Sequence, residues 1–281
     1  CGDPESTFNE ILIKTLKNKV YKNSKFPIII ICSEKLFQNE IKKQKVKLNL
    51  QKFENQTNLL KNKVYIFDIP LKKGKLSLIK KNEYIKKSFD VGLNLLKKNN
   101  LPALINGPIS KATFLKGKYK GITEYLAFKT GSLNEVMLIF NKELSVSPIT
   151  THVPINKVSQ KIKKEVIFKK INNINEFYKK FLGLKPNIAV TGLNPHCETF
   201  AGKNIEKEEI LPAIKKLKNK KIKILGPLSA DTIFLEANRK KFDVIVGMYH
   251  DQVLAPMKTI FGFDAINITI GLPFIRITPD H

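Results

Sequence analysis

Three histidines in this sequence could together bind a divalent metal. His152, His196 and His250 each follow a short apolar run that is typical of a buried strand. Neutral imidazoles are common ligands of transition metals, and a set of three leaves coordination positions open for a substrate. Because the three residues lie far apart in the sequence, only a fold that brings several strand ends together could form this site. The alternative interpretation is that each histidine is a hydrogen-bonded structural residue.

Two aspartates accompany these histidines. Asp251 directly follows His250, and Asp231 lies within the segment 228–232. Carboxylates at these places could orient metal ligands or transfer protons, and a divalent ion would act as a Lewis acid on a substrate oxygen. The alternative interpretation is helix capping, because both aspartates precede helix-like segments. The sequence does not choose among Zn²⁺, Mg²⁺ and Co²⁺.

An anion site is predicted around Arg276, which is one of two arginines in the chain. It stands at the end of an apolar run, and a guanidinium group is suited to a carboxylate or a phosphate. Lys258 and Asn267 precede it on a predicted helix and strand, and Thr123, at the start of another predicted helix, could donate to a phosphate. For Lys258, surface charge is the stronger alternative, because lysine is abundant throughout the chain.

The order of predicted elements indicates an α/β fold with a largely parallel sheet. The predicted strands are 26–32, 64–69, 103–106, 135–140, 188–191, 222–225, 244–247 and 265–270. The predicted helices are 34–45, 83–98, 123–130, 156–181, 206–218 and 251–260. In such folds, ligands bind beyond the carboxyl ends of the strands, which is where polar residues cluster in this sequence.

The chain is strongly basic, with 50 Lys+Arg against 24 Asp+Glu and a formal net charge of +26. Nucleic-acid binding is not predicted, because nearly all of the basic residues are lysine and tryptophan is absent. A cationic surface could still attract anionic substrates.

No apolar run approaches the roughly 18 residues of a membrane span. The three cysteines contain no CxxC pair, which favours a reducing, cytoplasmic setting.

Six segments, in this order, resemble the 4-hydroxythreonine-4-phosphate dehydrogenase family of vitamin B6 biosynthesis. They are NGPISK (106–111), TTH (150–152), GLNPH (192–196), GPLSADT (226–232), MYHDQ (248–252) and NITIGLPFIR (267–276). The resemblance implies a two-domain α/β fold like that of isocitrate and isopropylmalate dehydrogenases. It also implies a homodimer with the active site near the subunit interface. We accordingly expect a first domain of residues 1–120 plus 262–281 and a second domain of 121–261 that carries the histidines.

The resemblance also implies an activity and assigns residues to it. NAD or NADP would accept a hydride from 4-phosphohydroxy-L-threonine, and the resulting β-keto acid would lose CO₂. The three histidines match the metal ligands of the family. The positions that hold its substrate are matched by Thr123, Lys258, Asn267 and Arg276. Neither GxGxxG nor GxxxxGK occurs, so the cofactor must bind by another mode, and no cofactor residue is assigned.

The sequence departs from the family at Ile122, which replaces the histidine of the Gly-His-Thr-Glu motif and cannot donate a hydrogen bond to phosphate. An alternative is therefore a paralogous dehydrogenase that acts on another four-carbon phosphorylated hydroxy acid. A further alternative, outside the enzymes, is a basic binding protein without catalytic activity. Because the chain begins at Cys1 and stops after a strand-like run, we expect a fragment or a trimmed copy of a longer protein.

Overall fold

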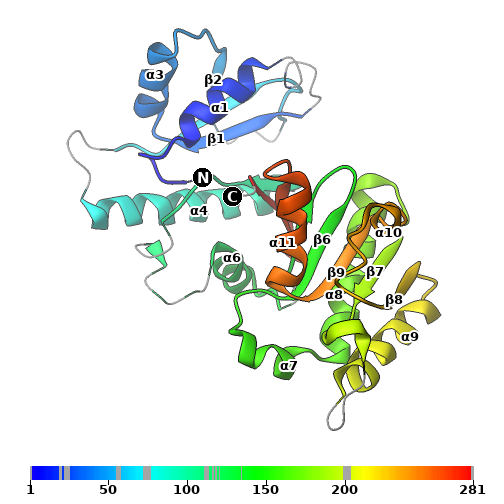
Figure 1. Cartoon of the computed structure of the whole chain (residues 1–281). Helices are drawn as coiled ribbons and strands as arrows, with labels where there is room; N and C mark the ends of the chain where they lie inside the picture. Colours follow the sequence, from blue (N-terminus) through cyan, green and yellow to red (C-terminus); the bar gives the residue numbers. More distant parts are fainter. Residues whose placement is uncertain are drawn as a thin grey trace. The chain divides into compact units, whose positions relative to one another are not determined.

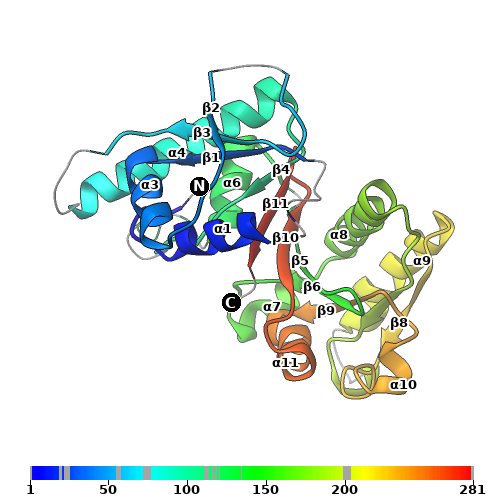
Figure 2. The same cartoon turned by 90° about the horizontal axis from the view of Figure 1, so that it is seen from above.

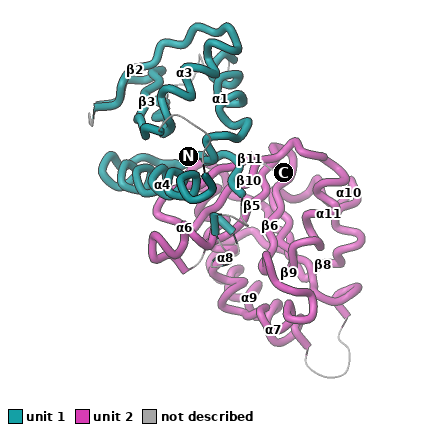
Figure 3. The backbone as a smooth tube through the Cα atoms, turned by 90° about the vertical axis from the view of Figure 1, so that its left-hand side faces the viewer, with its two compact units in different colours: residues 1–122 teal, residues 123–281 magenta. Residues whose placement is uncertain are grey.

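The structure is a computed structural model. It describes residues 2–18, 21, 26–54, 58–71, 77–110, 114–115, 117, 119, 121–133, 135–198 and 204–279. The chain forms two compact units, Cys1–Ile122 and Thr123–His281 (Figure 3). Within the described residues, no helix has both the length and the apolar character that crossing a membrane requires.

Unit 1 contains a small parallel sheet with helices packed against it. The strands of this sheet are β1 (Ile28–Cys32), β2 (Leu50–Lys52) and β3 (Val64–Asp68). Unit 1 also contains the short strand β4 (Ala103–Ile105), which is not part of this sheet, and the helices α1 (Phe8–Lys17), α3 (Glu34–Lys43) and α4 (Leu78–Asn99). Both β1 and β2 pair in parallel with β3, which lies between them. Apolar side chains of β1, β3, α1 and α3 share one buried core, which includes Ile13, Phe37 and Ile66.

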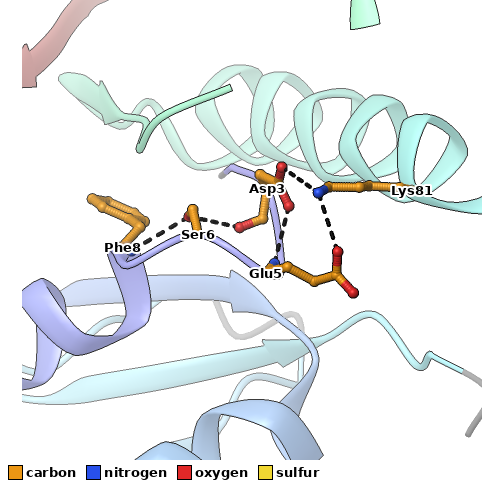
Figure 4. Close-up of polar contacts among 5 residues, drawn as sticks. All are labelled: Asp3, Glu5, Ser6, Phe8 and Lys81. Carbon is orange, nitrogen blue, oxygen red and sulfur yellow. Dashed lines mark hydrogen bonds and ion pairs between the residues drawn. The ribbon is translucent and has the colours of Figure 1, made fainter. Parts of the chain in front are cut away.

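The N-terminal turn of unit 1 is held against α4 by ion pairs. Lys81 Nζ lies 2.8 Å from Asp3 Oδ2 and 3.2 Å from Glu5 Oε2 (Figure 4). Within the turn, the Ser6 hydroxyl donates to the Asp3 carbonyl at 2.7 Å, and the Phe8 backbone N–H donates to Ser6 Oγ at 3.3 Å. These contacts fix the chain just before α1, a helix that the sequence pattern did not predict.

Unit 2 is built on a larger mixed sheet. Its strands are β5 (Val136–Phe140), β6 (Ser145–Thr150), β7 (Ile188–Thr191), β8 (Ile224–Leu228), β9 (Val244–Tyr249), β10 (Ile266–Ile270) and β11 (Ile275–Pro279). They lie in the order β11-β10-β5-β6-β9-β7-β8. The pairs β6–β9, β9–β7 and β7–β8 are parallel, whereas β5–β6, β5–β10 and β10–β11 are antiparallel. The predicted α/β class with mostly parallel strands is thus confirmed.

Helices cover both faces of this sheet. The α-helices are α6 (Ile122–Thr130, which begins one residue before unit 2), α7 (Val158–Lys161), α8 (Lys164–Phe177), α9 (Leu211–Asn219), α10 (Glu236–Arg239) and α11 (His250–Phe261). One buried core joins α8 and α9 to Val190 and Val246, and another joins α11 to Ala189 and Ile245 (Figures 1 and 2). Because neighbouring residues of a strand point to opposite faces, strands covered on both sides read as continuous apolar runs.

Two sequence expectations differ from this arrangement. The strand β6 was predicted only by its end before His152, without bounds, and it is buried along its whole length despite its serines and its proline. The segment 262–281 was expected to join the first domain, yet the structure groups it with residues 123–261. The reason is pairing: Ile268 of β10 lies opposite Leu138 of β5 and Ile277 of β11 in the sheet of unit 2.

Candidate metal and anion site

The three predicted histidines follow three neighbouring parallel strands. The strand order places β9 between β6 and β7, so the carboxyl ends of all three lie along one edge of the sheet. His152 follows the end of β6 by two residues, and His250 is the first residue of α11, directly after β9. His196 lies in the short turn η3 (Pro195–Cys197), and its backbone has a left-handed φ of 54°. Non-glycine residues in this conformation are strained, and they concentrate at functional sites.

The structure brings two of these histidines close together. The ring centroids of His152 and His250 are 6.4 Å apart. Two imidazoles on one tetrahedral zinc would have centroids roughly 5 Å apart, since Zn–N bonds are about 2.0–2.1 Å. An approach of about 1 Å would therefore let both rings bind one ion. Among the described residues, no group of three His, Cys, Asp or Glu side chains is close enough to hold a metal. His196 is thus near the pair in topology but does not complete a three-ligand site.

Each of the three imidazoles has a carboxylate beside it. His250 Nδ1 lies 2.7 Å from Asp251 Oδ1, and His196 Nδ1 lies 3.9 Å from Asp231 Oδ2. These are the two aspartates singled out in the sequence. The pKa of Asp231 is below its usual value, chiefly because the Ser229 hydroxyl donates to it at 2.6 Å. An ionised carboxylate only accepts hydrogen bonds, so Asp251 favours a protonated Nδ1 on His250 and leaves its Nε2 free to bind a metal. Asp231 lies beyond hydrogen-bond distance of His196 and acts on it through its charge.

The carboxylate beside His152 belongs to Glu124, a residue that the sequence analysis did not single out. Its Oε1 lies 3.3 Å from His152 Nδ1. Glu124 stands in the first turn of α6. Its contact with His152 joins residues that are 28 positions apart, which no local sequence pattern reveals. Within the described residues, His152 and His250 therefore each have a carboxylate within hydrogen-bond distance of Nδ1, whereas the carboxylate beside His196 is farther away.

Gln252 joins the turns that carry His196 and His250. Its side-chain Oε1 accepts from the Thr191 hydroxyl at 2.9 Å and from the Met248 backbone N–H at 2.6 Å, and its Nε2 donates to the Gly192 carbonyl at 2.8 Å. The side-chain amide of Gln252 therefore forms hydrogen bonds with groups at the ends of both β7 and β9. Gln252 belongs to the segment MYHDQ, but its role could not be predicted from the sequence, because the contacts with Thr191 and Gly192 span some 60 residues.

The anion site centres on Arg276, which is only 6% exposed. Its Nη1 lies 3.5 Å from the Thr123 hydroxyl and 3.4 Å from the Thr269 hydroxyl. Burial lowers the pKa of the guanidinium to about 10, and the charge of Glu124 opposes this effect. The group is still positive at neutral pH, and a buried cation of this kind is stabilised by an anionic partner.

The strands β10 and β11 present a polar face around this arginine. Asn267 lies opposite Thr278 and Thr269 lies opposite Arg276, so these four side chains share one face while Ile266, Ile268 and Ile270 of β10 alternate with them. Within the described part of the chain, the Asn267 Oδ1 and Thr278 Oγ1 atoms are buried and have no hydrogen-bond partner. Buried polar atoms are normally paired, so a bound ligand or water is expected at this face.

Lys258, the remaining residue of the predicted anion site, contacts an aromatic ring. It stands near the end of α11, where its Nζ lies 4.4 Å from the centroid of the Phe263 ring. The structure thus joins Thr123 and Arg276 directly and places Asn267 on the same polar face. A separate cavity of about 640 Å³ in unit 1, between the N-terminal turn and α3, is lined by none of the predicted site residues.

Comparison with known proteins decides the family. The profile of the family described as "Pyridoxal phosphate biosynthetic protein PdxA" matches residues 24–281. The chain belongs to the PdxA family. A 4-hydroxythreonine-4-phosphate dehydrogenase from Sulfurihydrogenibium sp. is 39% identical and aligns with 100% of this chain and 88% of its own length. The family resemblance of the six segments is thereby confirmed.

Two further PdxA relatives extend this comparison. The crystal structure of a 4-hydroxythreonine-4-phosphate dehydrogenase from Burkholderia phymatum superposes with a TM-score of 0.83 at 29% identity, over 100% of this chain and 88% of that one. A protein from Oceanobacillus iheyensis, provisionally named as a D-threonate 4-phosphate dehydrogenase, is 33% identical over 100% of this chain and 87% of its own length. The names of these two relatives therefore refer to two different four-carbon phosphates.

The residues fit the metal that the PdxA resemblance implies. Imidazole nitrogens backed by carboxylates form a donor set suited to Zn²⁺ or Co²⁺, and neighbouring carboxylates also suit Mg²⁺. Cys197, next to His196, is a weaker candidate, because burial raises the pKa of its thiol and a metal binds the thiolate. The histidines therefore fit a metal better than this cysteine does.

Proposed function

We propose that this chain is a metal-dependent, NAD(P)-linked dehydrogenase that oxidises 4-phosphohydroxy-L-threonine to a β-keto acid that then loses CO₂. The observation that supports this most directly is the first turn of α6. There Thr123 lies beside the buried Arg276, and the next residue, Glu124, lies beside His152. A single helical turn thus connects an anion site to a candidate metal ligand.

Some of these residues would bind the substrate or the metal, and others would accept the proton. Arg276, with the hydroxyls of Thr123 and Thr269, binds the phosphate or the carboxylate of the substrate through charge-assisted hydrogen bonds. His152, His196 and His250 would hold the metal. When bound, the metal polarises the substrate hydroxyl and the nicotinamide accepts the hydride. Asp251 keeps His250 in the ligating tautomer, and Asp231 and Asp251 offer exposed carboxylates for the released proton.

A second candidate substrate is D-threonate 4-phosphate or a similar phosphorylated hydroxy acid. Ile122 replaces a histidine of the family motif, and its side chain is 6% exposed, so it offers no hydrogen bond to a phosphate. The Oceanobacillus relative carries a name of this second kind. Both substrates share the phosphate and a secondary hydroxyl, so the same anion site and metal would serve either one.

The test is NAD(P) reduction by the full chain with each of the two phosphates, with and without a chelator. We expect reduction with 4-phosphohydroxy-L-threonine, its loss on chelation, and its recovery with Zn²⁺, Mg²⁺ or Co²⁺. Faster turnover of D-threonate 4-phosphate would favour the second candidate. If neither phosphate led to NAD(P) reduction, both candidate functions would be contradicted. A homodimer, a cytoplasmic location and the lack of nucleic-acid binding stay predictions.

A further inference from the structure

Glu124 occupies a distinctive position among the carboxylates of the site. The side chains of Asp251 and Asp231, which lie beside His250 and His196, are 83% and 57% exposed. The Glu124 side chain is only 27% exposed, and its Oε2 atom is buried. A carboxylate with so little freedom can hold an imidazole ring in one orientation more firmly than a solvent-exposed one.

Two cations share the surroundings of Glu124. Its charge stabilises the protonated forms of Arg276 and of Lys170, a half-buried residue of α8. The carboxylate therefore lies within electrostatic range of the anion site on one side while it contacts His152 on the other. Adjacent Thr123 contacts Arg276 directly, so one helical turn positions groups for both halves of the site.

We propose that Glu124 is a positioning residue that accepts the Nδ1–H of His152 and thereby presents His152 Nε2 to the metal. This inference rests on the proposed function only in requiring a metal, and it does not depend on which phosphate is the substrate. An ionised carboxylate has no hydrogen to donate, so the shared proton must lie on the imidazole Nδ1. Fixing the tautomer and the ring orientation raises the basicity of the ligating nitrogen, and removing such a partner typically lowers metal affinity 10–100-fold.

The experiment is a calorimetric titration of the metal-free full chain with Co²⁺ alone, without substrate. We expect Glu124→Ala to weaken Co²⁺ binding about 10–100-fold. Glu124→Gln should fall between this variant and the wild type, because its carbonyl can still accept the hydrogen bond but carries no charge. The control is Glu165→Gln, at a carboxylate of α8 that pairs with Lys216 at the surface, and we expect no change there.

A second measurement separates positioning from general structural support. Nitrogen-15 spectra of the histidine rings report which ring nitrogen carries the proton. We expect His152 to be Nδ1-protonated in the wild type and to lose this preference in Glu124→Ala. If Glu124→Ala does not fold, the near-isosteric Glu124→Gln carries both measurements.

The outcomes are distinct. Wild-type Co²⁺ affinity in Glu124→Ala, or an unchanged His152 tautomer, would overturn the inference, as would a wild-type chain that binds no Co²⁺. If Co²⁺ binds and weakens as expected but neither phosphate is oxidised, the inference stands and the proposed function fails.

Discussion

The imidazole rings of His152 and His250 lie 6.4 Å apart at the ends of β6 and β9, two parallel strands that pair directly. Their separation exceeds that of two rings on one tetrahedral ion by only about 1 Å. This relationship links the distant histidines of the sequence to one place in the fold, and the predictions below follow from the residues around it.

Replacing Arg276 tests the anion site. Arg276→Lys keeps the charge but loses the paired donors that lie near the Thr123 and Thr269 hydroxyls. Because a hydrogen bond to a charged group contributes about 1.5–3 kcal/mol, we expect KM for the phosphorylated substrate to rise roughly 10–100-fold, with a smaller effect on kcat. Arg239→Lys is the matched control, since Arg239 lies on α10 beside the Phe261 ring. Equal KM values for the Arg276 variant and the wild type would contradict the assignment.

Gln252 should stabilise the edge of the sheet that carries the site. Gln252→Ala removes three hydrogen bonds, which join the ends of β7 and β9. We expect the free energy of unfolding to fall by roughly 2–4 kcal/mol, as measured by urea denaturation. The exposed Gln160 of α7 provides the control, because Gln160→Ala should leave the unfolding midpoint unchanged. A loss below about 0.5 kcal/mol at Gln252 would show that water replaces these contacts.

Alkaline pH should weaken unit 2 through Tyr178. Its hydroxyl is buried and donates to Ser145 Oγ at 2.8 Å, and burial raises its pKa from 10.0 to about 12. A raised pKa means that folding favours the neutral phenol. The contribution, ~3 kcal/mol at most, is therefore complete below pH 10 and is lost as the pH rises from about 10 to about 12. In Tyr178→Phe, the free energy of unfolding should depend less steeply on pH in this window. If the free energy of unfolding fell equally with pH in Tyr178→Phe and in the wild type, this account would be contradicted.

The apolar strands were predictable because helices cover both faces of the sheet in unit 2. Strands such as β9 bury every second residue against α8 and α9 and the others against α11, so the run Val244–Val246 is apolar throughout. Only the end of the strand β6, before His152, was predicted, because the strand carries polar groups whose partners lie elsewhere. The Ser147 hydroxyl donates to the Met137 carbonyl, and the Thr150 hydroxyl donates to the Met248 carbonyl. No local pattern encodes such pairing.

The candidate site also contains some residues that could be predicted from the sequence and some that could not. The histidines could be found because they follow apolar runs, and the strand order then brought their ends to one edge. Glu124 and Gln252 acquire their roles only from contacts between distant segments, so sequence reasoning missed them. Thr269 had a usable signal, namely its alternation with Asn267 on a strand whose other residues are isoleucines. That period of two identifies a polar face of the strand.

The most direct test of the central claim is a Co²⁺ titration of the full chain, followed by the visible spectrum of the bound ion. The wild type should bind one ion with nitrogen and oxygen ligands. We expect His152→Ala, His196→Ala and His250→Ala each to lose most of this affinity while remaining folded. Cys197→Ser should bind as the wild type does, because burial keeps the neighbouring thiol protonated. Undiminished Co²⁺ binding in any of the three histidine variants would contradict its role as a metal ligand, and undiminished binding in all three would contradict the account as a whole.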